Sequence, residues 1–172
     1  MKNIIFIGGI HGSGKGKICQ EIISNFNINH LTASEVLKWT EISDQNSKAV
    51  SDITDTQNRL ISNLHKIVKN NETYLLDGHY CLLNSENQPE KIPIQTFIDI
   101  NPRKLILVVT DSLEVKNRLE ARDNKIYELA LIENFQKLEI EHANEISKVL
   151  VKPILVVDSL NYNLDNIINF LK

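Results

Sequence analysis

The chain has 172 residues, of which 42% are hydrophobic and 24% are charged, as in an ordinary globular protein with room for a substantial core. The net charge of −3 argues against a general nucleic-acid partner, which normally needs a basic excess. Two cysteines without paired Cys/His spacing favour neither a disulfide framework nor a structural zinc site. We therefore expect a cytoplasmic protein, with no apolar run long enough for a membrane partner.

An apolar run followed by a glycine-rich loop opens the chain. The run Asn3–Ile7 predicts a buried strand, and the loop Gly9–Lys15 reads Gly-Ile-His-Gly-Ser-Gly-Lys. Glycines let consecutive backbone N–H groups turn toward one anion, and the lysine adds a positive charge over the outer phosphates. A helix expected over Lys17–Phe26 points its positive end at the same anion. This order favours a phosphate-binding loop over a simple glycine-rich turn.

The loop and the two residues after it are the expected nucleotide contacts: Gly9, His11, Gly12, Ser13, Gly14, Lys15, Gly16 and Lys17. One position departs from the usual pattern. Gly16 follows the lysine, where a Ser or Thr normally reaches Mg²⁺.

The rest of the chain alternates strand-like runs with amphipathic helices. Nearly continuous apolar runs, typical of parallel strands covered on both faces, predict strands at Thr73–Leu76, Lys104–Val109 and Ile154–Val157, with a weaker candidate at His30–Thr32. Helical periodicity or a capping pattern predicts helices over Ile53–Val68, from Asp111–Glu114 onward, over Ile126–Ile146 and over Leu164–Leu171. The alternation predicts an α/β domain with a parallel sheet.

Two polar segments interrupt this pattern. Glu41–Asp55 lacks periodicity and is expected to form a loop or a mobile flap. Asn84–Lys91 is expected to form a turn or hairpin tip between Cys81–Leu83 and Ile92–Pro93.

Asp77 stands at the carboxyl end of a predicted strand, where ligands of open parallel sheets bind. Its carboxylate could hold Mg²⁺ through water or act as a base toward an attacking hydroxyl; the alternative is an ordinary Asp-Gly turn. His79 and Tyr80 follow directly and could orient a substrate or stack on a base, although packing explains them equally well.

Arg118 and Arg122 are four residues apart and share one helix face. A planar guanidinium that stays charged suits a phosphoryl group in transfer. The alternative is a solvated helix face on which the arginines pair with Glu114 and Glu120.

These motifs together resemble the adenylate kinase branch of the P-loop kinases. The sequence from Gly14 to Lys17 is similar to that family's Gly-Lys-Gly-Thr, with a lysine for the threonine. Leu31–Lys38 resembles its Ile-Ser-Thr-Gly-Asp-Met-Leu-Arg block, and Leu76–Cys81 resembles Asp-Gly-Phe-Pro-Arg with Cys81 at the arginine. Arg118 and Arg122 match the two arginines with which the lid segment begins in that family.

The resemblance implies a P-loop NTPase fold of three α/β/α layers around a five-stranded parallel sheet. It implies a single domain over residues 1–172, with a flap at about 31–70 and a short lid at about 118–126. Its cofactors would be ATP and Mg²⁺, the latter on Asp77 through water. The implied catalytic residues are Lys15, Asp77, Arg118 and Arg122, and the implied substrate-binding residues are Ala33, Lys38, His79 and Tyr80.

The leading hypothesis is an ATP-dependent kinase that phosphorylates a nucleotide or a related small metabolite. The missing loop hydroxyl and the absence of any arginine after Arg122 leave two alternatives open. One is an ATP-binding regulatory or interaction protein with weak ATPase activity, and the other is a small-molecule hydroxyl kinase. The acceptor and the oligomeric state are not readable from the sequence.

Overall fold

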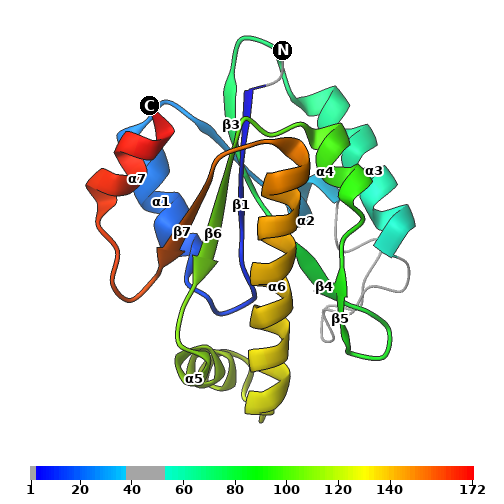
Figure 1. Cartoon of the computed structure of the whole chain (residues 1–172), viewed down its shortest axis with the longest axis vertical. Coiled ribbons are helices and arrows are strands. Elements are labelled where there is room, and N and C mark those ends of the chain that lie inside the picture. The colour runs from blue at the N-terminus through cyan, green and yellow to red at the C-terminus, as the bar shows by residue number, and fades with distance from the viewer. Residues whose placement is uncertain (1–2, 38–52) are drawn as a thin grey trace.

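A five-stranded parallel sheet forms the centre of the computed structural model, which describes residues 3–37 and 53–172 (Figure 1). Its spatial order is β2-β3-β1-β6-β7, and every neighbouring pair is parallel. The strands are β1 (Asn3–Gly8), β2 (Asn29–Thr32), β3 (Thr73–Asp77), β6 (Lys104–Val109) and β7 (Ile154–Asp158). All five predicted strands, including the weak candidate that became β2, are confirmed.

Helices and a small antiparallel hairpin accompany the sheet in the described part of the chain. The helices are α1 (Lys15–Asn25), α2 (Ala33–Leu37), α3 (Ile53–Ile67), α4 (Ile94–Ile100), α5 (Ser112–Asp123), α6 (Leu129–Leu150) and α7 (Leu164–Leu171). The hairpin pairs β4 (Cys81–Leu83) with β5 (Pro89–Lys91). Among the described residues, no helix is long and apolar enough to cross a membrane.

Side chains on β1 alternate between two apolar layers, because successive residues of a strand point to opposite faces. Ile4 and Phe6 pack in one buried cluster with α3, α4 and α6. Ile5 and Ile7 pack in another with α1 and α7. Figure 1 shows these two groups of helices on opposite faces of the sheet, which confirms the expected three-layer α/β/α fold.

Several helix boundaries differ from the sequence-based expectation. The long helix α6 begins at Leu129 instead of Ile126, whereas α5 ends at its cap Asn124, which adopts a left-handed conformation (φ 50°). Ile126 is consequently 86% exposed. Helix α3 begins at Ile53, as its periodicity predicts, so Ile53–Asp55 belong to this helix and not to the expected loop over Glu41–Asp55, and Ile53 is buried. Residues 41–52 lie outside the described part of the chain.

Two short helices and one strand had no signal in the sequence. Helix α4 has seven residues between Pro93 and Asn101, too few to display a helical period, although it buries Phe97 and Ile100. Helix α2 has five residues. The expected turn at Asn84–Lys91 is a hairpin in which the last three residues pair as β5, and polar hairpin strands lack a hydrophobic pattern.

Parallel pairing places the functional elements at one edge of the sheet. Ile7 of β1 is in register with Asp77 of β3, so the loop after β1 and the carboxylate at the end of β3 are neighbours. The carboxyl ends of parallel strands are where ligands bind in open α/β sheets.

Candidate functional site

The loop between β1 and α1 requires glycine at defined positions. A Cβ atom on Gly9 would lie 2.3 Å from the carbonyl oxygen of Val108 in β6. Gly14 caps α1 with φ 95°, a left-handed conformation that side chains disfavour. The glycines let the loop turn tightly between β1 and α1. With Gly14 as its cap, α1 begins at Lys15 and not at the expected Lys17.

Lys15 lies inside this loop. Its side chain is 9% exposed, and the Nζ atom donates a hydrogen bond of 2.6 Å to the carbonyl oxygen of Gly9. The neighbouring Ser13 is fully buried, and its hydroxyl oxygen has no hydrogen-bond partner. The loop thus presents a held ammonium group and an unsatisfied hydroxyl, both of which suit an anion.

A cavity of about 310 Å³ adjoins the loop. Its loop-side lining is His11, Gly12, Ser13, Gly14, Lys15 and Gly16. Asp77 lines it too and is the one carboxylate among the described lining residues. Burial raises the pKa of Asp77, while the nearby charge of Lys15 acts in the opposite direction. An acidic oxygen and an ammonium group therefore face the same space.

The other side of the cavity is apolar with two buried polar side chains. The apolar lining residues are Phe6, Ile10, Ala33, Leu37, Leu60, Leu82, Ile92, Phe97 and Ile100. Gln57 of α3 and Thr96 of α4 are only 4% and 5% exposed, and both line the cavity. Of the predicted substrate-binding residues, Ala33 and His79 line this space as well. The polar pair went unnoticed in the sequence because nothing local distinguishes it from surface residues.

His79 connects the end of β3 to the loop. Its Nδ1 lies 2.7 Å from the carbonyl oxygen of Gly9, and because a carbonyl only accepts, Nδ1 is the protonated ring nitrogen. Its ring centroid is 4.3 Å from that of His11. Burial and the charge of Lys15 lower the pKa of His79 well below its usual value. A neutral imidazole therefore helps to hold the loop backbone.

Tyr80 lies in the core and does not line the cavity. It is 0% exposed, its ring packs between Phe6 and Phe97, and its hydroxyl donates to the carbonyl oxygen of Ile106 at 3.1 Å. Packing, the alternative explanation for this residue, matches its position.

The two arginines of α5 lie outside the cavity lining, at different places. Arg118 pairs with Glu114 at 2.8 Å, and its Nη1 lies 3.2 Å from the carbonyl oxygen of Gly12. Arg122 instead makes a two-point ion pair with Asp123, with both contacts at 2.6 Å. Arg118 therefore contacts the loop, whereas Arg122 is paired with Asp123.

Three further predicted residues have different positions. Gly16 is exposed in the first turn of α1 and lines the cavity. Lys17 points its Nζ at the ring of Tyr162, 5.8 Å from the ring centroid, and is absent from the cavity lining. Lys38 lies outside the described residues.

Glu139 is a buried carboxylate that sequence reasoning missed. It is 1% exposed on α6 and accepts hydrogen bonds from the backbone N–H groups of Tyr80 (2.9 Å) and Cys81 (2.6 Å). Burial raises its pKa to about 7. A glutamate four residues after Phe135 and four before Ala143, on a mainly apolar helix face, was the signal available in the sequence.

Comparisons with known proteins agree with this geometry. The profile of the AAA domain family matches residues 8–150, which include the loop, Asp77 and both arginines. UMP-CMP kinase 1 of Oryza sativa subsp. japonica is 25% identical in an alignment of 128 residues that covers 70% of this chain. The matched region is 51% of that protein, so the chain spans about half the length of this curated relative.

Proposed function

The chain belongs to the AAA domain family, among its P-loop, nucleoside-monophosphate-kinase-like members, and from this premise we propose that it is an ATP-dependent phosphotransferase. It transfers the terminal phosphoryl group of ATP to a nucleotide or a related small metabolite. The observation that carries the proposal is a single cavity that joins the phosphate loop, Asp77 and an apolar compartment containing Gln57 and Thr96. Donor and acceptor can therefore meet in one place.

The loop residues bind the donor. The backbone N–H groups from Gly12 to Gly16 and the positive end of α1 face the phosphates, and Lys15 supplies the mobile charge. When phosphate oxygens arrive, they replace the carbonyl oxygen of Gly9 as partners of the Lys15 ammonium group. The buried hydroxyl of Ser13, without a partner in the structure, is a further donor.

The residues around Asp77 fit a magnesium ion. A carboxylate oxygen is a hard ligand of the kind that Mg²⁺ prefers, and Asp77 is the one carboxylate among the described residues of the cavity lining. Asp77 would hold the ion through water. Gly16, which follows Lys15, has no side-chain hydroxyl that could bind the ion directly. When bound, Mg²⁺ neutralises charge on the phosphate oxygens.

Arg118 and Arg122 stabilise the charge that develops during transfer, which is mainly an electrostatic task. Arg118 already lies against the loop through Gly12. Arg122 must exchange Asp123 for a phosphoryl oxygen, and its ion pair is half exposed, so this exchange costs little.

The acceptor lies in the apolar compartment next to Ala33 and His79. Gln57 and Thr96 are buried polar residues of the cavity lining, and their side chains hydrogen-bond the polar edge of the acceptor. Lys38 remains the predicted contact for an acceptor phosphate.

The test is to incubate the full chain with Mg²⁺ and ATP, together with a panel of nucleoside monophosphates and nucleosides, and to follow the products by phosphorus NMR. We expect ADP formation that depends on one or a few acceptors. Lys15→Ala should abolish this transfer, whereas Lys69→Ala, which changes an exposed lysine paired with Glu72, should leave it unchanged.

Other results would select among the alternatives. ATP binding without transfer to any acceptor would contradict a kinase and support a regulatory ATP-binding protein. Transfer only to a neutral hydroxyl, with turnover lost in Asp77→Asn at unchanged ATP affinity, would assign Asp77 as a base in a hydroxyl kinase.

A further inference from the structure

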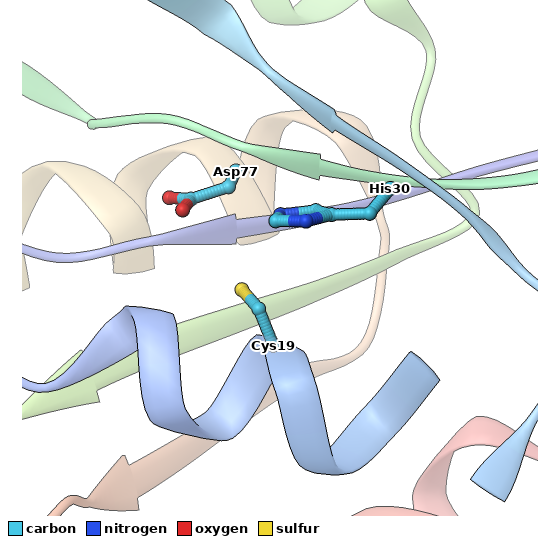
Figure 2. Close-up of side chains that lie close together, drawn as sticks. All are labelled: Cys19, His30 and Asp77. Atoms are coloured by element: carbon cyan, nitrogen blue, oxygen red, sulfur yellow. The ribbon is translucent and has the colours of Figure 1, made fainter. Parts of the chain in front are cut away.

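A cluster of three metal-ligating side chains lies at the edge of the site. Among residues 3–37 and 53–172, Cys19, His30 and Asp77 form the one group of three His, Cys or acidic residues whose ligand atoms all lie within 4.8 Å of one another. Figure 2 shows that Cys19 projects from α1, His30 from β2 and Asp77 from the end of β3. The side chains of Cys19 and His30 extend toward Asp77.

The pairing of the strands creates this cluster. His30 is in register with Leu75, which lies two residues before Asp77 and therefore on the same face of the sheet. Leu75 packs in the cluster that α1 covers, and Cys19 belongs to that cluster. Helix α1 thus brings a thiol to the face that carries both the imidazole and the carboxylate.

One polar atom of the cluster has no partner in the fold, and the thiol beside it lies in the apolar core. The Nε2 atom of His30 is buried and has no hydrogen-bond partner, which is unfavourable for a polar atom. Cys19 is 0% exposed, and burial together with the charge of Asp77 raises the pKa of its thiol to about 12. In the metal-free protein the thiol is therefore protonated, and a metal ion must displace this proton into solvent as the metal–sulfur bond forms.

We propose that Cys19, His30 and Asp77 bind a divalent transition-metal ion of intermediate softness, such as Zn²⁺ or Co²⁺. Thiolate and imidazole ligands favour such ions over Mg²⁺, and three protein ligands leave a fourth position open. Asp77 also lines the cavity, so an ion held by this carboxylate would adjoin the cavity wall. Metal–ligand bonds of about 2.0–2.3 Å require the ligand atoms to approach by about 1 Å, which side-chain rotations can supply.

Occupation of this site has a consequence for the proposed function, on which this part of the inference rests. Asp77 is the carboxylate assigned to the water shell of Mg²⁺. A Zn²⁺ ion that takes this carboxylate removes it from that role, and the second positive charge repels Mg²⁺. The site is therefore inhibitory, and Mg²⁺ does not displace the ion because it has little affinity for a thiolate.

Cobalt spectroscopy of the full chain tests the site without reference to activity. The chelator-treated protein is titrated with Co²⁺, and we expect a near-ultraviolet thiolate-to-cobalt charge-transfer band that saturates at one equivalent and disappears when Zn²⁺ is added. Cys19→Ala should abolish the band. Cys81→Ala, which removes the other buried cysteine, should retain it.

His30→Asn provides a second variant with the core cysteine intact, and it should weaken or abolish the band, whereas the exposed His65→Asn should not. Thermal unfolding by circular dichroism verifies that each variant is folded. Absence of a band in the wild-type protein, or a band that survives both Cys19→Ala and His30→Asn, would overturn the proposal.

The inhibition is measured separately. Zn²⁺ at a concentration that saturates the site should suppress transfer from Mg²⁺-ATP in the wild-type protein, and this suppression should be lost in His30→Asn. Uninhibited transfer with Zn²⁺ bound would refute the inhibitory role. A cobalt band in a protein that transfers nothing would support the metal site and refute the proposed function.

Discussion

The two sides of the cavity are built in different ways. The side that we propose for the donor consists of consecutive residues from His11 to Gly16, which offer mainly backbone groups and one lysine. The side that we propose for the acceptor collects side chains from β1, α2, α3, β4 and α4, which are distant in the sequence. A phosphate group needs only N–H groups and charge, which a short loop supplies, whereas a shaped compartment needs the packed fold.

The stabilising contacts differ in the same way. On the donor side, glycines remove steric conflict, as Gly9 does beside Val108. On the acceptor side, a buried carboxylate of a distant helix fixes the backbone. Glu139 of α6 accepts hydrogen bonds from the backbone N–H groups of Tyr80 and Cys81, where the hairpin begins. Substitutions on the two sides should therefore separate donor binding, acceptor binding and stability.

The largest expected effect is on the donor side, in Gly9→Ala. The new Cβ would lie 2.3 Å from a backbone carbonyl oxygen, at a position with φ 152°. We expect a loss of about 3 kcal/mol in the free energy of unfolding, together with loss of ATP binding. Urea unfolding and calorimetric ATP titration measure the two effects. Normal stability with normal ATP binding would show that the loop is less constrained than its geometry indicates.

Next is the pH dependence contributed by Glu139. Its pKa in the folded protein, about 7, lies above the ordinary glutamate value of 4.5. Because the folded protein holds this proton more tightly than the unfolded chain does, protonation of Glu139 stabilises the fold, and the effect is complete at a pH below the unfolded-state pKa. This contribution of up to about 3 kcal/mol to the free energy of unfolding is lost as the pH rises through about 7. Urea unfolding at several pH values should show this decline relative to Glu139→Gln, which cannot titrate. Parallel curves for the two proteins would contradict the assignment.

An intermediate effect is expected for Gln57→Leu on the acceptor side. The substitution keeps the size of the side chain but removes the amide that lines the cavity. We expect KM for the acceptor to rise about tenfold, with ATP affinity unchanged. Gln95→Leu is the matched control, because Gln95 is exposed and donates to Asp99 at 2.8 Å. Equal effects of both variants would remove Gln57 from the acceptor site.

The smallest effect concerns Gly16, where a Cβ atom would have no neighbour within 4 Å. Gly16→Ala should stabilise the protein by about 0.5–1 kcal/mol, because glycine is unfavourable in a helix. Gly16→Ser should in addition tighten Mg²⁺-ATP binding by restoring a hydroxyl after Lys15. Calorimetric titration with and without Mg²⁺ compares the two variants. Identical Mg²⁺ dependence in both would exclude a magnesium ligand at this position.

Prediction from sequence succeeded where a feature depends on neighbouring residues. The runs that became β1, β3 and β6 are apolar because both faces of the sheet are covered, and the cap of α5 is visible as Asp111, which accepts from the N–H groups of Leu113 and Glu114. It failed for α2 and α4, which are too short for a periodic pattern. For Tyr80 it offered substrate contact or packing, and the side chain is 0% exposed and packs against Phe6 of β1 and Phe97 of α4.

The site was predictable to the same extent. Lys15 and Asp77 stand in recognisable contexts, a glycine-rich loop and a strand end, and both line the cavity. Gln57 and Thr96 have no local signal, because their exposure depends on how α3 and α4 pack. The Cys19–His30–Asp77 cluster has none either, since its members have no metal-binding spacing along the chain.

The sequence by itself determined the α/β architecture, the order of its strands and helices along the chain, and the phosphate loop. Each of these follows from conformational preferences and hydrophobic patterns that act over a few residues. Only the tertiary structure decided the sheet order, the acceptor compartment and the convergence of Cys19 and His30 on Asp77. These depend on strand register and helix packing, through which residues distant along the chain become neighbours.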